Sequence, residues 1–342
     1  MHPFTSLRRS SILALAAVAI LALPTFAAAA IQLPGPLVDA QWLHAHLNDV
    51  TVIDVRNDPK TFTTPPRYET LKNGQRRLLA VGGHIPGSHL VRFADIRVPR
   101  EIDGRQINFM RPSAYAFQSV MQDSGLTADR PIIVVSPSDT NGSLEGGTAS
   151  IDTAARLYWT LKTLGAKNIA LLNGGVAGWL QSGYPVETSE PDLMPGDWTA
   201  QKPDLQWSAD TGNVSSAAKT GTQVIDARPM RQYLGIEKVG VVSKYGHIPG
   251  AQAFPTDSIT RQDGIAVYYL TKAGYDKVLP QLGISASRPT ITYCNTGHFA
   301  AGAWFVMSQI VGNPHTRLYD GSMLEWTKED RPVTPVDGTI AQ

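Results

Sequence analysis

The sequence predicts an α/β fold of two tandem domains, each a parallel β-sheet flanked by helices. Three observations predict it. Short apolar, β-branched runs alternate with helical segments, a set of motifs occurs twice in the same order, and the length of 342 residues suits two domains. The chain is 42% hydrophobic and 17% charged, an ordinary globular composition with enough apolar residues for a sizeable core.

Four motifs of the first half recur in the second half. VIDVR at 52–56 recurs as VIDAR at 224–228, and GHIPGS at 83–88 recurs as GHIPGA at 246–251. The dipeptide RP occurs at 130–131 and at 288–289, each time directly before an apolar run. NGG at 173–175, followed by Trp179, corresponds to DGS at 320–322, followed by Trp326. Four matches in one order are not expected by chance. They indicate an internal duplication.

Compact apolar runs predict the buried strands of the two sheets. They lie at 52–55, 132–135 and 169–172 in the first half and at 224–226 and 290–293 in the second. Helical spacing predicts one helix over 154–164, stopped by Gly165, and another over 300–310, ended near Gly312. Because strands and helices alternate, each sheet is expected to be parallel.

Residues 1–30 have the pattern of a secretory signal peptide. Arg8 and Arg9 precede an apolar run at 11–23, and alanines fill 27–30, so we expect cleavage before Ile31. The run is short for a membrane span of about 20 residues. The cleaved protein is therefore expected in the periplasm or outside the cell, with no membrane association. The arginine pair leaves the general and the twin-arginine export routes open.

The remaining chain is expected to divide into an N-terminal domain at 31–187, a linker at 188–210 and a C-terminal domain at 211–342. The linker region carries prolines and no clear period, and we expect it to cross the partner domain. Residues 137–147 are rich in Ser, Gly, Asp and Asn, which is typical of a mobile loop. We expect this loop to border the cleft between the domains.

Several classes of partner are not expected from the sequence. The formal net charge of +1 provides no field that would recruit nucleic acid. One cysteine and eight separated histidines show no metal-ligand spacing, so no metal is expected. No Gly-rich loop followed by Lys is present to bind a nucleotide. We therefore expect a protein that works without a cofactor.

The single cysteine, Cys294, follows the predicted strand at 290–293 and precedes a helix that begins near Ala300. Open α/β sheets bind ligands at this end of their strands. Gly297 allows the loop to curl so that backbone N–H groups point inward, and the helix N-terminus adds positive potential. Both effects favour the thiolate. The alternative is a buried core cysteine, but the position favours a nucleophile that attacks a sulfane sulfur and holds a persulfide.

The chain resembles the tandem-domain rhodanese family, which includes thiosulfate and 3-mercaptopyruvate sulfurtransferases. The motifs that carry the resemblance are VIDxR, both GHIPG segments, RLYW at 156–159, DARPMRQYLG at 226–235 and YDGSMLEW at 319–326. The resemblance implies two rhodanese-like domains, of which the C-terminal one is catalytic, with Ser136 at the lost site of the other. It also implies transfer of a sulfane sulfur from a small donor, thiosulfate or 3-mercaptopyruvate, to a thiol or cyanide acceptor.

The resemblance assigns roles to particular residues. Cys294 matches the sulfur acceptor, and the active loop continues through Asn295, Thr296, Gly297, His298 and Phe299. Arg231 matches an arginine that contacts the anionic substrate. His84 matches a histidine near the active site of mercaptopyruvate enzymes.

Some positions depart from the family pattern. The loop positions Asn295 and Thr296 are neutral, where thiosulfate-selective loops carry cations. A second substrate-binding arginine would fall at Gly240, so we expect Lys238 or Lys244 to substitute for it. No carboxylate occurs at 71–83 to act as a proton relay for His84. Asp54 and Asp226 are expected to pin strands and not to catalyse.

Two other functions compete with sulfur transfer. A cysteine phosphatase or arsenate reductase uses a similar loop but needs an arginine six positions after the cysteine, where this chain has Ala300. A non-enzymatic periplasmic binding or redox-partner module with a degenerate fold would instead have a Cys294 of ordinary reactivity.

Overall fold

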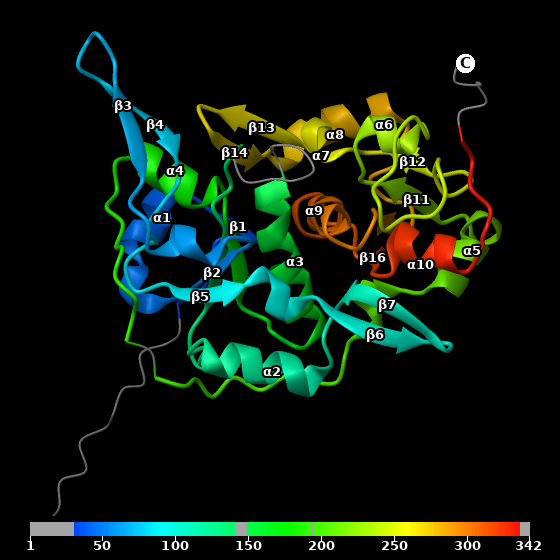
Figure 1. Ribbon diagram of the computed structural model, residues 1–342, viewed down its shortest axis with the longest axis horizontal. Coiled ribbons are helices and arrows are strands. Elements are labelled where there is room, and N and C mark those ends of the chain that lie inside the picture. The colour runs from blue at the N-terminus through cyan, green and yellow to red at the C-terminus, as the bar shows by residue number, and fades with distance from the viewer. Residues whose placement is uncertain (1–30, 141–148, 193, 336–342) are drawn as a thin grey trace, which may run out of the picture.

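The computed structural model describes residues 31–140, 149–192 and 194–335 (Figure 1). The predicted signal peptide at 1–30 and most of the predicted loop at 137–147 lie outside the described residues. Two five-stranded sheets form, with all neighbouring strands parallel, and helices cover them. The predicted α/β fold with tandem parallel sheets is therefore confirmed.

The two sheets have equivalent strand orders, as a duplication requires. The first is β1-β9-β8-β2-β5, with strands Leu37–Val38, Ile169–Leu172, Ile132–Val135, Thr51–Arg56 and His89–Arg92. The second is β10-β16-β15-β11-β12, with strands Ser208–Ala209, Thr316–Tyr319, Thr290–Tyr293, Gln223–Asp226 and Gln252–Ala253. Of the strands expected from the sequence, β8, β9 and β15 have the predicted bounds, and β2 and β11 are slightly longer.

The two predicted helices form, but with different ends. Helix α3 spans Ala149–Thr163 and so begins before the predicted start. Helix α9 spans Phe299–Phe305, and a π-helical turn, Val306–Ile310, follows it. The prediction of one α-helix over 300–310 was wrong in its second half. There the N–H of Val311 donates to the carbonyl of Val306 at 2.8 Å, which closes the wider turn.

The other helices flank the sheets or cap their ends. They are α1 Ala40–Ala45, α2 Ala114–Asp123, α4 Gly175–Gln181, α5 Thr211–Thr220, α6 Met230–Tyr233, α7 Thr256–Ile259, α8 Lys272–Val278 and α10 Ser322–Lys328. Short 3₁₀ turns lie at Leu47–Asp49, Pro59–Phe62, Phe93–Ile96, Leu205–Trp207 and Leu279–Leu282. Local signals set some ends. Asp210 forms a capping box before α5, and Gly221 ends that helix with a positive φ of 69°.

The repeated VIDxR and GHIPG motifs meet in the folded chain. Asp54 and Arg56 form a buried ion pair of 2.6 Å, and Arg56 also donates to the carbonyl of Gly83. Asp226 and Arg228 repeat this pair at 2.6 Å, with Arg228 donating to the carbonyl of Gly246. Each pair ties a central strand to the turn before the next strand. The two aspartates therefore pin strands, as predicted.

The domains pack through a shared apolar core. Helices α3 and α9 lie side by side at the centre (Figure 1), and one cluster of buried side chains includes residues of both, such as Leu157 and Phe305. Gly302 of α9 allows the close approach, because a Cβ there would lie 1.8 Å from Oδ1 of Asp152 on α3. The hydroxyl of Thr256 donates to Oδ2 of the same carboxyl group at 3.0 Å.

Three antiparallel hairpins that the sequence did not reveal complete the fold. They are β3–β4 (Arg67–Thr70, Arg76–Ala80), β6–β7 (Val98–Ile102, Arg105–Met110) and β13–β14 (Thr260–Asp263, Ala266–Tyr269). The last two reach across to the opposite domain. Asn173 exchanges two hydrogen bonds with the backbone of Tyr269, and Leu324 packs against Ile107 and Met110. Each of these last two hairpins thus covers part of the other domain at the end of its sheet.

The predicted linker lies along the N-terminal domain. The backbone N–H of Trp198 donates to the carbonyl of Leu126 at 3.1 Å, and that of Gln201 donates to the carbonyl of Leu164 at 2.8 Å. Among the residues that the structure describes, no helix has the length and apolar character needed to span a membrane.

Candidate active site

Cys294 directly follows β15 at the carboxyl end of the second sheet and is 1% exposed. Its backbone is held by the start of α10. The N–H of Cys294 donates to Oγ of Ser322 at 3.1 Å, and its carbonyl accepts from the N–H of Met323 at 3.0 Å. The sulfur-bearing residue is therefore anchored on a strand end and not carried by a mobile loop.

The loop after Cys294 curls back toward the same serine. Gly297 has a φ of +73°, and its N–H donates to Oγ of Ser322 at 3.1 Å. A Cβ on Gly297 would lie 2.6 Å from Nη1 of Arg156 and 2.7 Å from Oδ1 of Asp320. Both the left-handed backbone and the close contacts require glycine at this position. This is the curl that the sequence predicted for Gly297.

Cys294 is part of the apolar core cluster, and the N-terminal end of α9 and the guanidinium of Arg228 lie near it. Helix α9 begins at Phe299, five positions after the cysteine, so its N-terminal end faces the loop. Burial lowers the pKa of Arg228, but the charge and hydrogen bonds of Asp226 raise that pKa overall, with smaller contributions from Tyr293 and Cys294. Arg228 therefore interacts electrostatically with Cys294, while its guanidinium is paired with Asp226 at 2.6 Å.

The loop side chains are held by residues of both domains. Asn295 donates from Nδ2 to Gln232 at 2.7 Å. Nε2 of His298 lies 3.1 Å from the hydroxyl of Thr153 on α3. Thr296 accepts from Nη2 of Arg97 through its hydroxyl at 2.6 Å and through its carbonyl at 3.3 Å.

The N-terminal domain supplies two arginines to the loop, Arg97 and Arg156, which were not predicted as site residues. Besides Arg97, Arg156 donates to the carbonyl of Gly297 at 3.2 Å and forms an ion pair of 2.5 Å with Asp320. Arg111 is buried and donates from its backbone N–H to Oδ2 of Asp320 at 2.7 Å. The RLYW motif pointed to Arg156. No repeat or motif marked Arg97, because it contacts the loop only across the domain interface.

The contacts of Arg231 and His84 are with residues outside the Cys294 loop. The side chain of Arg231 is 67% exposed and pairs with Glu237 at 3.2 Å, although its neighbour Gln232 contacts the loop. His84 is fully buried. Its Nδ1 lies 2.9 Å from the carbonyl of Phe62, and its Nε2 lies 3.7 Å from a carboxylate oxygen of Glu187.

These contacts limit what the two residues can do in this conformation. The contacts of His84 belong to the N-terminal domain, and its carboxylate partner is Glu187 and not a residue of the preceding segment 71–83. Lys244 is also engaged elsewhere, because it binds the carbonyls of Asp330 and Arg331. Lys238 lies over the ring of Tyr245.

Ser136 occupies the equivalent position of the first domain, at the end of β8. It is fully buried, and its hydroxyl lies 3.0 Å from that of Ser138. The hairpin β13–β14 closes over this end, with the N–H of Val267 donating to the carbonyl of Ser138 at 2.8 Å.

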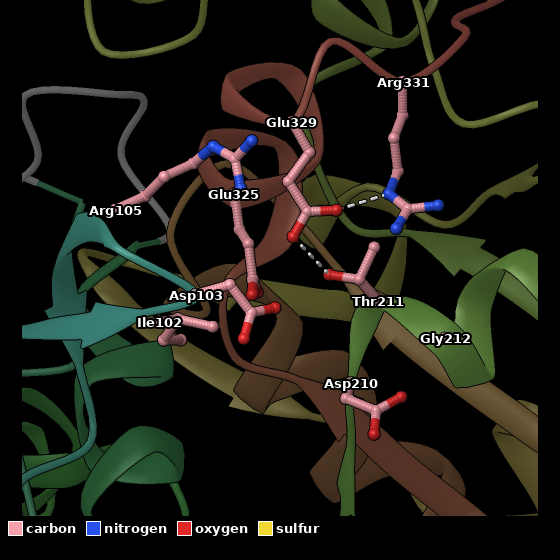
Figure 2. Close-up of a pocket in the computed structure, with 9 residues that line it drawn as sticks. All are labelled: Ile102, Asp103, Arg105, Asp210, Thr211, Gly212, Glu325, Glu329 and Arg331. Atoms are coloured by element: carbon pink, nitrogen blue, oxygen red, sulfur yellow. Dashed lines mark hydrogen bonds and ion pairs between the residues drawn. The ribbon is translucent and has the colours of Figure 1, made fainter.

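A separate pocket of about 570 Å³ lies beyond helix α10 (Figure 2). Ile102, Asp103, Arg105, Asp210, Thr211, Gly212, Glu325, Glu329 and Arg331 line it. Glu329 links Arg331 to Thr211, as the dashed lines in Figure 2 show. No loop residue of the Cys294 site lines this pocket, so it is not the place where a donor would meet the thiol. Among the described residues, no group of three or more His, Cys, Asp or Glu side chains is arranged to hold a metal.

A comparison with protein families matches the rhodanese-like domain at residues 39–182 and 212–329, which together make up more than half of the chain. The chain belongs to the rhodanese-like domain family. The two matched segments hold four of the five strands of each parallel sheet, since β1 and β10 lie just before them. The Cys294 loop falls in the second rhodanese-like domain.

Curated relatives extend over most of the chain. A 3-mercaptopyruvate sulfurtransferase of Escherichia coli (strain K12) is 28% identical over 303 residues, covering 87% of this chain and 98% of the relative. A thiosulfate sulfurtransferase of Corynebacterium glutamicum is 26% identical over 306 residues, covering 86% and 88%. A sulfur carrier protein of Thermus thermophilus is 25% identical over 310 residues, covering 86% and 94%. The relatives of this rhodanese-like protein are thus named for sulfur transfer, with different donors.

Solved structures share the fold. The 3-mercaptopyruvate sulfotransferase of Escherichia coli matches with a TM-score of 0.65 and 24% identity, covering 84% of this chain and 98% of that one. An anaerobic ergothioneine biosynthesis enzyme of Chlorobium limicola matches with a TM-score of 0.68 and 18% identity, covering 88% and 70%. At these identities the likeness concerns the arrangement of the two domains.

Proposed function

We propose that this protein is a sulfurtransferase that moves a sulfane sulfur from a small donor, thiosulfate or 3-mercaptopyruvate, to a thiol or cyanide acceptor. The observation that carries the proposal is the position of Cys294. Its thiol lies at a strand end, before the N-terminus of α9, in a loop whose curl depends on Gly297 and Ser322. The sulfurtransferase names of the relatives support the same reaction class.

The reaction proceeds in two displacements at Cys294. With thiosulfate, the thiolate attacks the outer sulfur, the S–S bond of the donor breaks, and sulfite leaves with the electron pair. With 3-mercaptopyruvate, the C–S bond breaks, and the carbon takes the electron pair and a proton to give pyruvate. Cyanide then attacks the terminal sulfur of the persulfide. Thiocyanate leaves, and the thiolate returns.

The geometry does not fit the first alternative function, that of a cysteine phosphatase or arsenate reductase. Ala300, where a cysteine phosphatase needs its arginine, is fully buried in α9 and offers no cation to a tetrahedral oxyanion. The arginines that reach the loop come from the other domain, and Arg156 is occupied by Asp320 and Gly297. Sulfur transfer therefore remains the function that the site supports best.

We further propose that the protein acts in the periplasm or outside the cell, after removal of residues 1–30. Support comes from the sequence pattern of that segment. The test is to express the full chain in a bacterium and determine the N-terminal residue of the protein in the periplasmic fraction. Ile31 is expected, and an uncleaved chain confined to the cytoplasm would contradict the proposal.

The test of the reaction is thiocyanate production by protein spanning residues 31–342. Cyanide is supplied with either thiosulfate or 3-mercaptopyruvate, and Cys294→Ser is the control. Turnover with at least one donor, absent in Cys294→Ser, is expected. If the folded protein turns over neither donor and its thiol titrates near the ordinary value of about 8.5, the function is instead that of a binding or redox-partner module.

A further inference from the structure

A pocket of the N-terminal domain lies between the β3–β4 hairpin and the end of helix α4. Its volume of about 590 Å³ is typical of pockets that hold a small organic molecule. Tyr68 and Arg76 line it from the hairpin, and Tyr184 and Val186 line it from the segment after α4. None of the described residues that line it belongs to the C-terminal domain, so the pocket is distinct from the Cys294 site.

The aromatic and apolar side chains of this pocket are held in place by the core of the N-terminal domain. The ring of Tyr184 stacks on that of His44, with 4.3 Å between the ring centres, and its centre lies 4.7 Å from that of Trp179. Tyr68 and Val186 pack against the same cluster of buried side chains as Tyr184. Because these groups are already ordered, an apolar ring that covers them would cost little conformational entropy in the protein.

Arg76 is the one charged side chain among the described residues that line the pocket. Its guanidinium carbon lies 4.0 Å from the ring centre of Tyr68, which holds the planar group over the ring. The carboxylate of the hairpin, Glu69, pairs with the neighbouring Arg77 at 2.7 Å. Within the part of the chain that the structure describes, Arg76 has no ion pair, so the edge of its guanidinium is available to an anion.

The charge of the hairpin also favours an anion. Residues 67–80 carry Arg67, Lys72, Arg76 and Arg77 against the carboxylate of Glu69. The hairpin extends from the body of the molecule, so its positive charge faces solvent (Figure 1). The pocket beyond helix α10 has a different character, because four carboxylates and two guanidinium groups line it (Figure 2).

We infer that the pocket beside the β3–β4 hairpin binds a small aromatic carboxylate. The aromatic ring lies against the apolar side chains, and the carboxylate accepts hydrogen bonds from the guanidinium of Arg76. Such charge-assisted bonds to a planar guanidinium are stronger than those between neutral groups, so the charge of the ligand decides its affinity. This binding site is separate from the proposed sulfur transfer and does not depend on it.

The experiment is isothermal titration calorimetry of the protein, expressed with its full sequence, with 2-naphthoate as the probe. A Kd of about 1 mM or tighter is expected, and the uncharged 2-naphthamide should bind at least about tenfold more weakly. In Arg76→Met, the Kd for 2-naphthoate should rise at least about tenfold, while that for 2-naphthamide stays within about twofold. Arg77→Met is the matched control and should keep the Kd for 2-naphthoate within about twofold, since Arg77 pairs with Glu69 and does not line the pocket.

Three results would overturn the inference. They are no binding of 2-naphthoate by the unchanged protein up to about 10 mM, equal affinity for the acid and the amide, or an equal loss in Arg76→Met and Arg77→Met. The comparison of the two ligands uses the unchanged protein alone, so it remains decisive even if Arg76→Met does not fold. Because the readout is binding and not thiocyanate formation, failure of the proposed sulfur transfer would leave this test intact.

Discussion

The hydroxyl oxygen of Ser322 accepts a hydrogen bond from the backbone N–H of Cys294 at 3.1 Å. It accepts a second from Gly297 at 3.1 Å and gives its own proton to the carbonyl of Tyr319 at 2.9 Å. The backbone of Ser322 has a φ of +52°, a conformation that residues other than glycine rarely adopt. The equivalent residue of the first domain is Gly175, with a φ of +53°. The C-terminal domain therefore has a serine in a strained conformation, with its hydroxyl bonded to the Cys294 loop, where the N-terminal domain has a glycine.

Replacing this hydroxyl is expected to loosen the loop. Ser322→Ala leaves two buried N–H groups without their acceptor while keeping the strained φ, so the free energy of unfolding should fall by about 1–3 kcal/mol. The kcat for thiocyanate formation should fall at least about tenfold, because the cysteine is no longer held in place. Urea unfolding and steady-state kinetics measure the two effects.

Two further variants make that result specific. Ser322→Gly loses the same hydroxyl but relieves the strain, so its stability should lie between those of Ser322→Ala and the unchanged protein. Ser119→Ala, at an exposed position of α2, should change neither quantity. Equal stability of Ser322→Ala and the unchanged protein would show that the hydroxyl does not hold the loop.

The ion pair between Arg156 and Asp320 joins the domains beneath the active loop. Asp320→Ala should lower the free energy of unfolding by about 3–5 kcal/mol, because it leaves the buried Arg156 charge uncompensated. Asp95→Ala removes the exposed pair with Arg92, which solvent screens, and should cost much less. Thermal and urea unfolding compare the variants. Similar losses in both would mean that the buried pair contributes no more than a surface pair.

Gly302 permits the close packing of α9 on α3. In Gly302→Ala, the new Cβ would meet Oδ1 of Asp152 at 1.8 Å, and Thr256 holds that carboxyl group in place. Overpacking at the domain interface should destabilise the protein by about 1–3 kcal/mol. Gly240→Ala is the control, because a Cβ there has nothing within 4 Å. If the two variants unfold at the same temperature, the Asp152 side chain moves aside without cost.

Glu325 should make stability depend on pH. Burial raises the pKa of Glu325 to about 7, with the charges of Glu329 and Asp320 adding to it against the hydrogen bond of Tyr319. The folded protein therefore holds a proton between pH 4.5 and 7 that the unfolded chain has released. The stabilising effect of that proton is complete below pH 4.5 and is lost as pH rises toward 7.

Glu325→Gln isolates this effect. Between pH 4.5 and 7, deprotonation of Glu325 should lower the free energy of unfolding of the unchanged protein by at most about 1.4 kcal/mol per pH unit. Screening by solvent makes the actual fall smaller. Burial also raises the pKa of Asp152, which adds a decline of the same sign to both proteins. Urea unfolding at pH 4.5 and 7 should therefore show a smaller decline in Glu325→Gln. Equal declines would mean that Glu325 does not titrate in this range.

The sequence by itself determined the duplication, the central strands and the loop that carries the cysteine. These features are local. The runs at 132–135, 169–172 and 290–293 (IIVV, IALL and TITY) are rich in apolar or β-branched residues, and the structure places strands with those bounds. Cys294, Gly297 and the helix after them also follow from neighbouring residues, since a strand end, a left-handed glycine and a helix N-terminus are each encoded within a few positions.

Tertiary structure alone decided which residues of the first half reach that loop. Arg97 and Thr296 are 199 positions apart, and Arg111 and Asp320 are 209 apart. Their contacts depend on the β6–β7 hairpin, whose polar strands carry no strong alternation, and on how closely α3 packs on α9 at Gly302. A repeat or a motif indicates the strands and turns that each domain needs to fold by itself. Contacts across an interface depend on the geometry of both domains together, so no local pattern in the chain could predict them.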